Sequence, residues 1–132
     1  MSIRGIIDGS FVVTSTAATI ETFTVPTTNT SPIINVSLTF FLNGSMCTLV
    51  IDSFSASTTS NVILDMSNPG IAKYLPMNTI RQSVVINNGD GNVNGYVNWN
   101  QATNVLSITT LSTGSGDIIG FDDAKSINYI IN

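Results

Sequence analysis

The sequence contains no histidine, a single cysteine and few charged side chains. Asp, Glu, Lys and Arg make up 9% of its 132 residues, against about 25% in an average globular domain. Without an imidazole there is no Ser-His-Asp or Cys-His catalytic arrangement. One cysteine and no histidine also exclude an ordinary zinc site. We therefore expect a protein that is not an enzyme, with Cys47 buried as a small hydrophobe.

Positive charge and long apolar runs are scarce as well. The four basic residues, Arg4, Lys73, Arg81 and Lys125, are dispersed, and the net charge is −4 at pH 7. Nucleic-acid binding needs clustered cations, so the sequence argues against it and against binding to an anionic membrane. No apolar run approaches the roughly 20 residues of a membrane-spanning helix. The first residues also lack the apolar core of a signal peptide.

What the chain has instead is Ser, Thr and Asn, between short apolar stretches that amount to 42% hydrophobic residues. The composition shows no break, which is typical of one folded domain with a real core. We expect residues 10–132 to form this domain. Residues 1–9 are either an N-terminal anchor or its first strand.

Apolar and polar residues alternate over most of the chain with the period of two that predicts β-strands. The clearest stretch, residues 36–42, is followed by Asn43-Gly44, a dipeptide favoured in tight hairpin turns. The chain then returns over residues 46–51. Further strands are predicted at residues 10–14, 20–25, 61–66, 80–86, 93–99, 105–110, 117–121 and 126–131. About ten short strands separated by turns predict an all-β sandwich or barrel.

Short motifs between residues 36 and 131 occur in the order seen in the fibre-tip domains of viruses and phages. They are FLNGSMCTL at 41–49, LPMNTIR at 75–81, NGDGNVNGYVNW at 88–99, GF at 120–121 and SINYI at 126–130. In this order the chain resembles the C1q/TNF-like jelly-roll domains of virion proteins. The resemblance implies a jelly-roll β-sandwich that assembles as a homotrimer on a virion, together with other virion or capsid proteins. No collagen-like or coiled-coil stalk precedes the motifs here, which favours a minor capsid or decoration subunit over a fibre head.

Several aromatic residues fall outside the predicted core pattern. Phe41 is out of phase with its strand, and Tyr96 shares a face with asparagines. With few charged groups to cover it, such a surface favours burial between subunits. We predict a trimer interface at Phe41, Tyr96, Phe121 and Tyr129. The alternative is that these rings lie under loops of their own subunit.

A second hypothesis is a carbohydrate-binding or receptor-binding module for host attachment, in which Asn88, Asp90 and Asn92 contact a host-surface glycan. Trp99 is the other aromatic candidate for stacking on a sugar. Its strand places it on the same face as two valines, which favours a core position.

The acidic residues leave two further options. Asp90, or the group Asp117, Asp122 and Asp123, offers oxygen ligands for calcium, although the spacing matches no EF-hand. Adjacent Asp122 and Asp123 are the closest pair of carboxylates for a hydrolase. A solvated turn before the last strand is the simpler interpretation of that pair, and we assign no cofactor.

Overall fold

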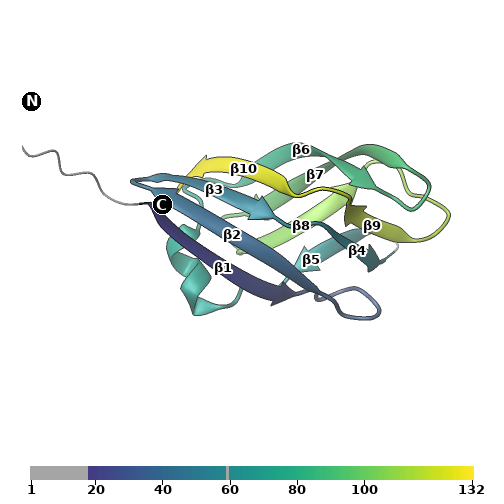
Figure 1. The fold of residues 1–132 in the computed structure, drawn as a ribbon, viewed down its shortest axis with the longest axis horizontal. Coiled ribbons are helices and arrows are strands. Elements are labelled where there is room, and N and C mark those ends of the chain that lie inside the picture. The colour runs from purple at the N-terminus through teal and green to yellow at the C-terminus, as the bar shows by residue number, and fades with distance from the viewer. Residues whose placement is uncertain (1–17, 59) are drawn as a thin grey trace, which may run out of the picture.

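The computed structural model describes residues 18–58 and 60–132, and within these ranges it contains ten strands and one short 3-10 helix (Figure 1). In chain order the elements are β1 (Thr19–Pro26), β2 (Asn35–Asn43), β3 (Met46–Ile51), β4 (Phe54–Ser57), β5 (Asn61–Leu64), η1 (Pro69–Tyr74), β6 (Ile80–Asn87), β7 (Asn92–Asn100), β8 (Val105–Thr110), β9 (Ile118–Phe121) and β10 (Lys125–Ile130). The expected all-β class is confirmed. The predicted strand at residues 10–14 and the anchor or first strand at residues 1–9 lie outside the described residues.

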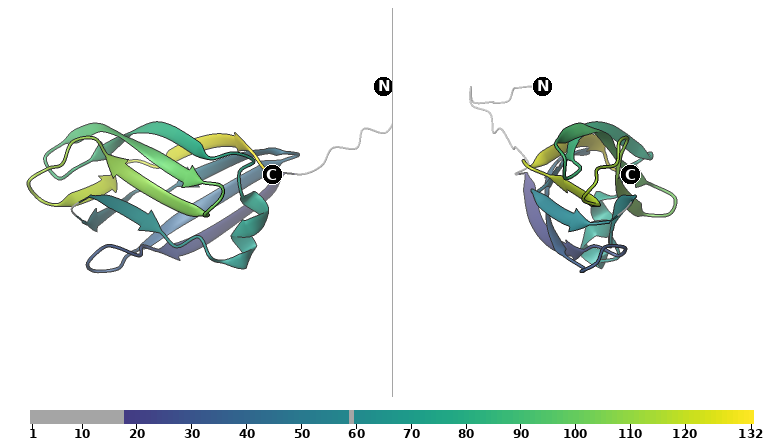
Figure 2. Two further views of the ribbon diagram at one scale, coloured as in Figure 1. Left: turned by 180° about the vertical axis from the view of Figure 1, so that it is seen from behind. Right: turned by 90° about the vertical axis from the view of Figure 1, so that its right-hand side faces the viewer.

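The strands form two antiparallel sheets that pack face to face (Figures 1 and 2). The first sheet has the order β1-β2-β3-β10, and the second has the order β4-β9-β6-β7-β8-β5. The chain passes to the second sheet after β3 and returns with β10. Isolated bridges at Thr27–Leu64 and Pro76–Ile131 link the two sheets, and the sandwich has the rounded section seen in Figure 2. The predicted sandwich is confirmed.

The β2–β3 hairpin lies where the alternation predicted it, but its turn is one residue further on. Asn43 pairs with Met46, so the two loop residues are Gly44 and Ser45 rather than Asn43 and Gly44. Gly44 has φ of +64°. A two-residue hairpin turn with a positive φ at its first residue has a backbone twist that matches the twist of the strands. Glycine adopts this conformation without steric cost.

Aromatic rings fill one end of the core. Phe40 of β2 stacks on Tyr74 of η1 with the ring centroids 4.5 Å apart and the planes at 9°. Trp99 of β7 lies 6.2 Å from Phe40, and its indole N–H donates to the Asn104 side-chain oxygen over 2.9 Å. Trp99 is 1% exposed, so its predicted core position is confirmed and it is not available to stack on a sugar.

Cys47 is buried, as predicted, at 1% exposure. Burial raises the pKa of its thiol, because the surrounding apolar residues disfavour the thiolate.

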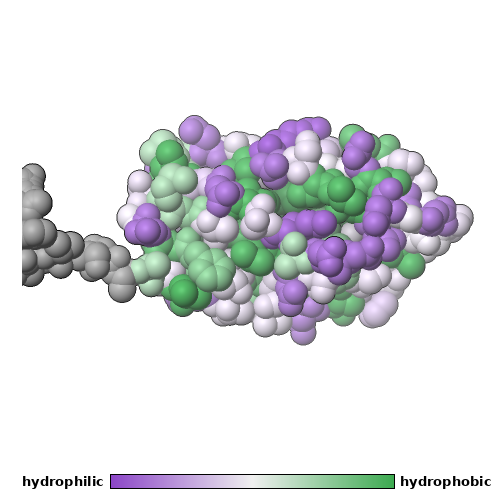
Figure 3. All heavy atoms as spheres, turned by 45° about the horizontal axis from the view of Figure 1, so that its top comes forward, coloured by the Kyte–Doolittle hydropathy of each residue, from purple (hydrophilic) through white to green (hydrophobic). Residues whose placement is uncertain are grey.

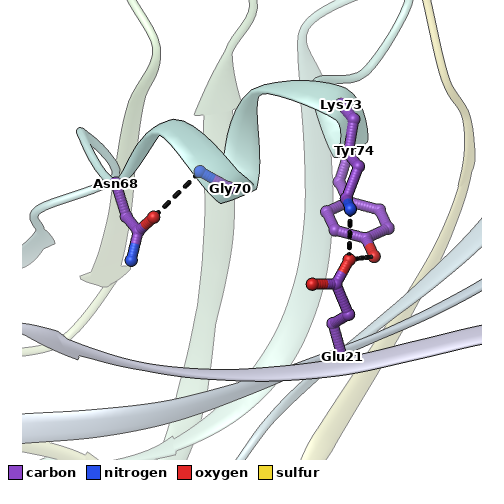
Figure 4. Close-up of polar contacts among 5 residues, drawn as sticks. All are labelled: Glu21, Asn68, Gly70, Lys73 and Tyr74. Carbon is purple, nitrogen blue, oxygen red and sulfur yellow. Dashed lines mark hydrogen bonds and ion pairs between the residues drawn. The ribbon is translucent and has the colours of Figure 1, made fainter.

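Helix η1 lies between the strands predicted at residues 61–66 and 80–86, where the sequence analysis predicted no helix. The Asn68 side chain caps its start by accepting from the Gly70 N–H over 2.9 Å. At its other end, Glu21 of β1 accepts hydrogen bonds from the Lys73 ammonium, at 2.5 Å, and from the Tyr74 hydroxyl (Figure 4). The Lys73 hydrogen bond, then that of Tyr74, lowers the pKa of Glu21. These contacts fasten η1 across one end of the sandwich.

Candidate functional site

The outward face of the first sheet carries no charged side chain among the described residues. Its outward positions alternate with the buried core positions and hold Ser, Thr, Asn and a few large apolar groups. The outward residues are Ile20, Thr22, Thr24 and Pro26 of β1, Asn35, Ser37, Thr39, Phe41 and Asn43 of β2, Met46, Thr48 and Val50 of β3, and Ser126, Asn128 and Ile130 of β10. Some of the polar groups satisfy one another across strands, as in Thr48–Asn128 at 2.6 Å and Thr22–Thr39 at 2.9 Å.

Four large apolar side chains gather at one end of this face. We call Ile20, Phe41, Met46 and Ile130 the apolar patch. They are 60%, 39%, 50% and 47% exposed. Ile20 is paired directly opposite Phe41, and Met46 directly opposite Ile130. Figure 3 shows apolar atoms at this end of the molecule, next to the point where the described chain begins, and a further apolar band along the middle of the same view.

A groove continues the apolar patch around the edge of β10. It has a volume of about 310 Å³ and lies between β10 and the start of β6, with Met77, Ile80 and Ile130 among its lining residues. Met77 is 50% exposed, and its backbone N–H donates to the Ile130 carbonyl over 2.8 Å. The apolar surface at this end is therefore continuous from the first sheet onto the segment before β6.

The four aromatic residues predicted for an interface are not all on the surface. Phe41 is exposed in the apolar patch, as its phase in the strand indicated. Phe121 and Tyr129 are 2% and 7% exposed inside their own subunit, so the premise that they need a sister chain for cover is wrong. Phe121 packs edge-on against Phe54 at 5.1 Å. Tyr129 faces the core, where it packs edge-on against Trp99 at 5.8 Å and donates its hydroxyl proton to the Tyr74 carbonyl over 2.8 Å.

Tyr96, the fourth of these aromatics, lies half-buried on the outward face of the second sheet. The guanidinium carbon of Arg81 lies 3.6 Å from the centre of its ring. Strand pairing sets Asn98 opposite Arg81, and Ser83 and Thr109 on either side of Tyr96. We call Arg81, Ser83, Tyr96, Asn98 and Thr109 the Arg81 cluster. The sequence did not single out Arg81, because its contact with Tyr96 depends on the register between β6 and β7.

The three residues predicted to contact a glycan form a turn that is largely occupied with its own contacts. Asn88 is 3% exposed; its amide donates to the Ser112 carbonyl over 2.9 Å and its oxygen accepts from the Asp90 N–H. The prediction for Asn88 is therefore wrong, because a buried and bonded amide does not reach a ligand. Asp90 accepts from the backbone N–H and hydroxyl of Ser115 at 2.9 and 2.8 Å, which lowers its pKa. Asn92 is exposed at the start of β7.

Asp122 and Asp123, the pair considered for a hydrolase, lie in the solvated turn that was the simpler interpretation. They lie exposed in the bend between β9 and β10, and the Asn87 amide donates to Asp122 over 2.9 Å. Within residues 18–58 and 60–132 no group of three or more Cys, Asp or Glu side chains is placed to hold a metal ion. No helix in the described part of the chain is both long and apolar enough to cross a membrane.

The fold and its surfaces define the class: an all-β sandwich of two antiparallel sheets whose first sheet, over the described residues, has an uncharged and partly apolar outer face. Neither a protein-family model nor a curated protein sequence matches the chain. Among solved structures, the chain is similar to a reovirus attachment protein, sigma1, solved in complex with alpha-2,3-sialyllactose. The TM-score is 0.56 at 14% identity, and the match covers 88% of this chain and 66% of the sigma1 chain, just under two thirds. At this identity the likeness concerns the fold.

Proposed function

We propose that this chain is a non-enzymatic subunit of a virion surface assembly, a C1q/TNF-like jelly roll that forms a homotrimer. Its place is in a minor capsid, decoration or fibre-head structure, in contact with other virion or capsid proteins. The observation that carries the proposal is the apolar patch, because Ile20, Phe41, Met46 and Ile130 lie together on a sheet face that has no charged residue among those described. Large apolar groups gathered in this way on an exposed surface are typical of protein–protein contacts.

The area of the patch agrees with a contact between copies. At 39% to 60% exposure, each side chain offers on the order of 80–100 Å² for burial, so the four supply about half of the roughly 800 Å² per partner in a standard interface. The rest comes from the Thr, Ser and Asn side chains beside the patch and from the Met77 groove. Several of these polar groups already hydrogen-bond to one another, so covering them costs little.

The mass of the protein in solution tests this assembly. We expect light scattering at micromolar concentration to report three copies of the 14.0 kDa chain. A monomer under these conditions would contradict the proposal.

A second candidate function is host attachment through a carbohydrate, and a different surface favours it. The outward face of β5 to β8 is rich in amides and hydroxyls and holds one cation, Arg81, among its described residues. Amide and hydroxyl side chains are the groups with which proteins orient sugars. The similar fold of sigma1, a viral attachment protein solved with a sialylated glycan, adds support. Virion assembly and glycan binding are compatible, because the apolar patch lies on the outward face of the first sheet and these amides and hydroxyls lie on the outward face of the second.

A further inference from the structure

Arg81 is the single charged residue in the four neighbouring strands β6, β7, β8 and β5. The acidic residues of the described chain lie elsewhere, on β1 or in the turns and loops between strands. Within residues 18–58 and 60–132 the ion pair is Lys73–Glu21, and Arg81 approaches no carboxylate. The protein as a whole is negatively charged. Within the described part of its subunit, Arg81 is therefore an isolated positive charge.

The guanidinium is also held in place. It lies flat enough on Tyr96 for its central carbon to be 3.6 Å from the ring centre. A cation over a tyrosine ring is stabilised by the negative face of the π-system, and the stacked guanidinium keeps its N–H groups along its edge. Since the ring face is covered, the cluster does not offer Tyr96 as a platform for a sugar. It offers instead the N–H groups of the Arg81 guanidinium, held in position as a fork of hydrogen-bond donors. This fork matches the geometry of the two oxygens of a carboxylate.

The residues around the Arg81 guanidinium indicate whether the carboxylate belongs to a sugar or to a peptide. Asn98 stands opposite Arg81, and Ser83 and Thr109 flank Tyr96, at cross-strand side-chain spacings of about 5 Å. These are neutral donors and acceptors of the kind that hydrogen-bond to sugar hydroxyls. The cluster itself holds no aliphatic group, and the large exposed aliphatic groups in these strands are Val85 and Val105, at 47% and 41%. They are smaller than the four side chains of the apolar patch, so a protein partner has less to bury here. An acidic sugar fits better than an acidic peptide.

We propose that the Arg81 cluster binds the carboxylate of an acidic glycan, such as a sialic or uronic acid residue. Arg81 takes the carboxylate in a bidentate pair, Tyr96 positions the guanidinium, and Asn98 with the two hydroxyls contacts the sugar ring. This inference rests on the host-attachment candidate above, for which it names the ligand class and the site.

The test is a titration of the full-length protein with sialyllactose, and with lactose as the matched neutral glycan, followed by NMR of the backbone amides and the Arg81 side chain. We expect sialyllactose to shift the resonances of Arg81, Tyr96 and Asn98, and lactose to leave them in place. Equal shifts with both glycans, or shifts confined to other residues, would overturn the proposal.

Two charge-matched variants complete the test. Arg81→Gln removes the fork, and Lys125→Gln removes one positive charge on β10 of the other sheet. We expect Arg81→Gln to weaken sialyllactose binding about tenfold or more, since charge-assisted hydrogen bonds are worth at least that factor, and Lys125→Gln to bind as the wild type does. Arg81→Lys keeps the positive charge but not the planar pair of donors. We expect its affinity for sialyllactose to lie between those of Arg81→Gln and the wild type.

Two results would count against the assignment. Equal weakening in both Gln variants would mean that net charge, not the cluster, attracts the ligand. A glutamate-rich peptide that binds the cluster more tightly than sialyllactose would overturn the choice of a glycan. Light scattering on the same samples keeps the assembly question separate, since a trimer that binds neither glycan fails this proposal alone.

Discussion

Replacement of Phe41 by Thr removes the central aromatic ring of the apolar patch and leaves a residue that suits a strand. Phe41 is 39% exposed on the subunit, which for a phenylalanine is about 80 Å² that a sister chain would cover. At 25 cal/mol per Å² the burial is worth about 2 kcal/mol, or about a thirtyfold change in the equilibrium constant of one interface.

A trimer contains three such interfaces, so the total loss is about 6 kcal/mol, and the concentration of half-dissociation rises about a hundredfold. Sedimentation equilibrium over a dilution series measures this concentration. The matched control is Leu111→Thr, because Leu111 is 68% exposed beside the second sheet, where its N–H donates to the Asn94 carbonyl. We expect the control to dissociate as the wild type does.

Two results would refute the reasoning about Phe41. One is a Phe41→Thr protein that dissociates at the wild-type concentration. The other is equal weakening by Leu111→Thr, which would mean that general surface hydrophobicity drives association. Chemical denaturation of each variant at a concentration where it is monomeric separates loss of association from loss of subunit stability.

Three further predictions concern the subunit itself. Trp99, the only tryptophan, is 1% exposed, so its fluorescence should resist acrylamide, and ready quenching would place the ring outside the core. Gly95→Ala should lower the free energy of unfolding by about 1–3 kcal/mol, because an added Cβ would lie 2.1 Å from the Ile86 side chain. The control is Gly116→Ala, where the nearest atom to the added Cβ is 3.7 Å away, so its free energy of unfolding should be close to that of the wild type. Denaturant titrations measure both. Asp90 has a lowered folded-state pKa, so its contribution to stability is present above its unfolded pKa and is lost as pH falls through the folded one. Asp90→Asn should therefore be less stable than the wild type at neutral pH, and this gap should close under acid; a gap independent of pH would contradict the account.

The strands were predictable because the period-two pattern is local and strong. Leu106, Ser107, Ile108 and Thr109 alternate between apolar and polar, and β8 has the predicted bounds, Val105–Thr110. Strand β4, by contrast, was not predicted. Its four residues, Phe54–Ser57, offer too short a pattern to stand out, and its position depends on pairing with β9.

Helix η1 could not be predicted from its own residues, since the contacts that hold it come from far along the chain. Asn68-Pro69-Gly70 indicates a turn, and a turn does begin there. What extends it to Tyr74 is the packing of that ring on Phe40 and its hydrogen bond to Glu21, 53 residues earlier.

The candidate surfaces were predictable only in part. Alternation separates two faces of a strand, but does not say which face the second sheet covers. The exposure of Phe41 was predicted correctly, because the alternate residues on the other side of β2 are all apolar; its place in a trimer interface stays a prediction. The exposure of Tyr129 was predicted wrongly, because both faces of β10 carry isoleucine and the burial of its ring depends on Trp99 across the core. Arg81 was missed because its contact with Tyr96 exists only in the paired sheet.

Methionine oxidation measures most directly whether the apolar surface is covered by sister chains. Met46 and Met77 are each 50% exposed on the subunit, and Met66, at 3%, is an internal reference for the folded core. Exposed thioethers oxidise readily, whereas buried ones are protected. We predict that peroxide oxidises Met46 and Met77 slowly at high protein concentration and much faster on dilution, while Met66 stays protected throughout. Rapid oxidation of both these methionines at every concentration, with the core reference intact, would contradict assembly through this face.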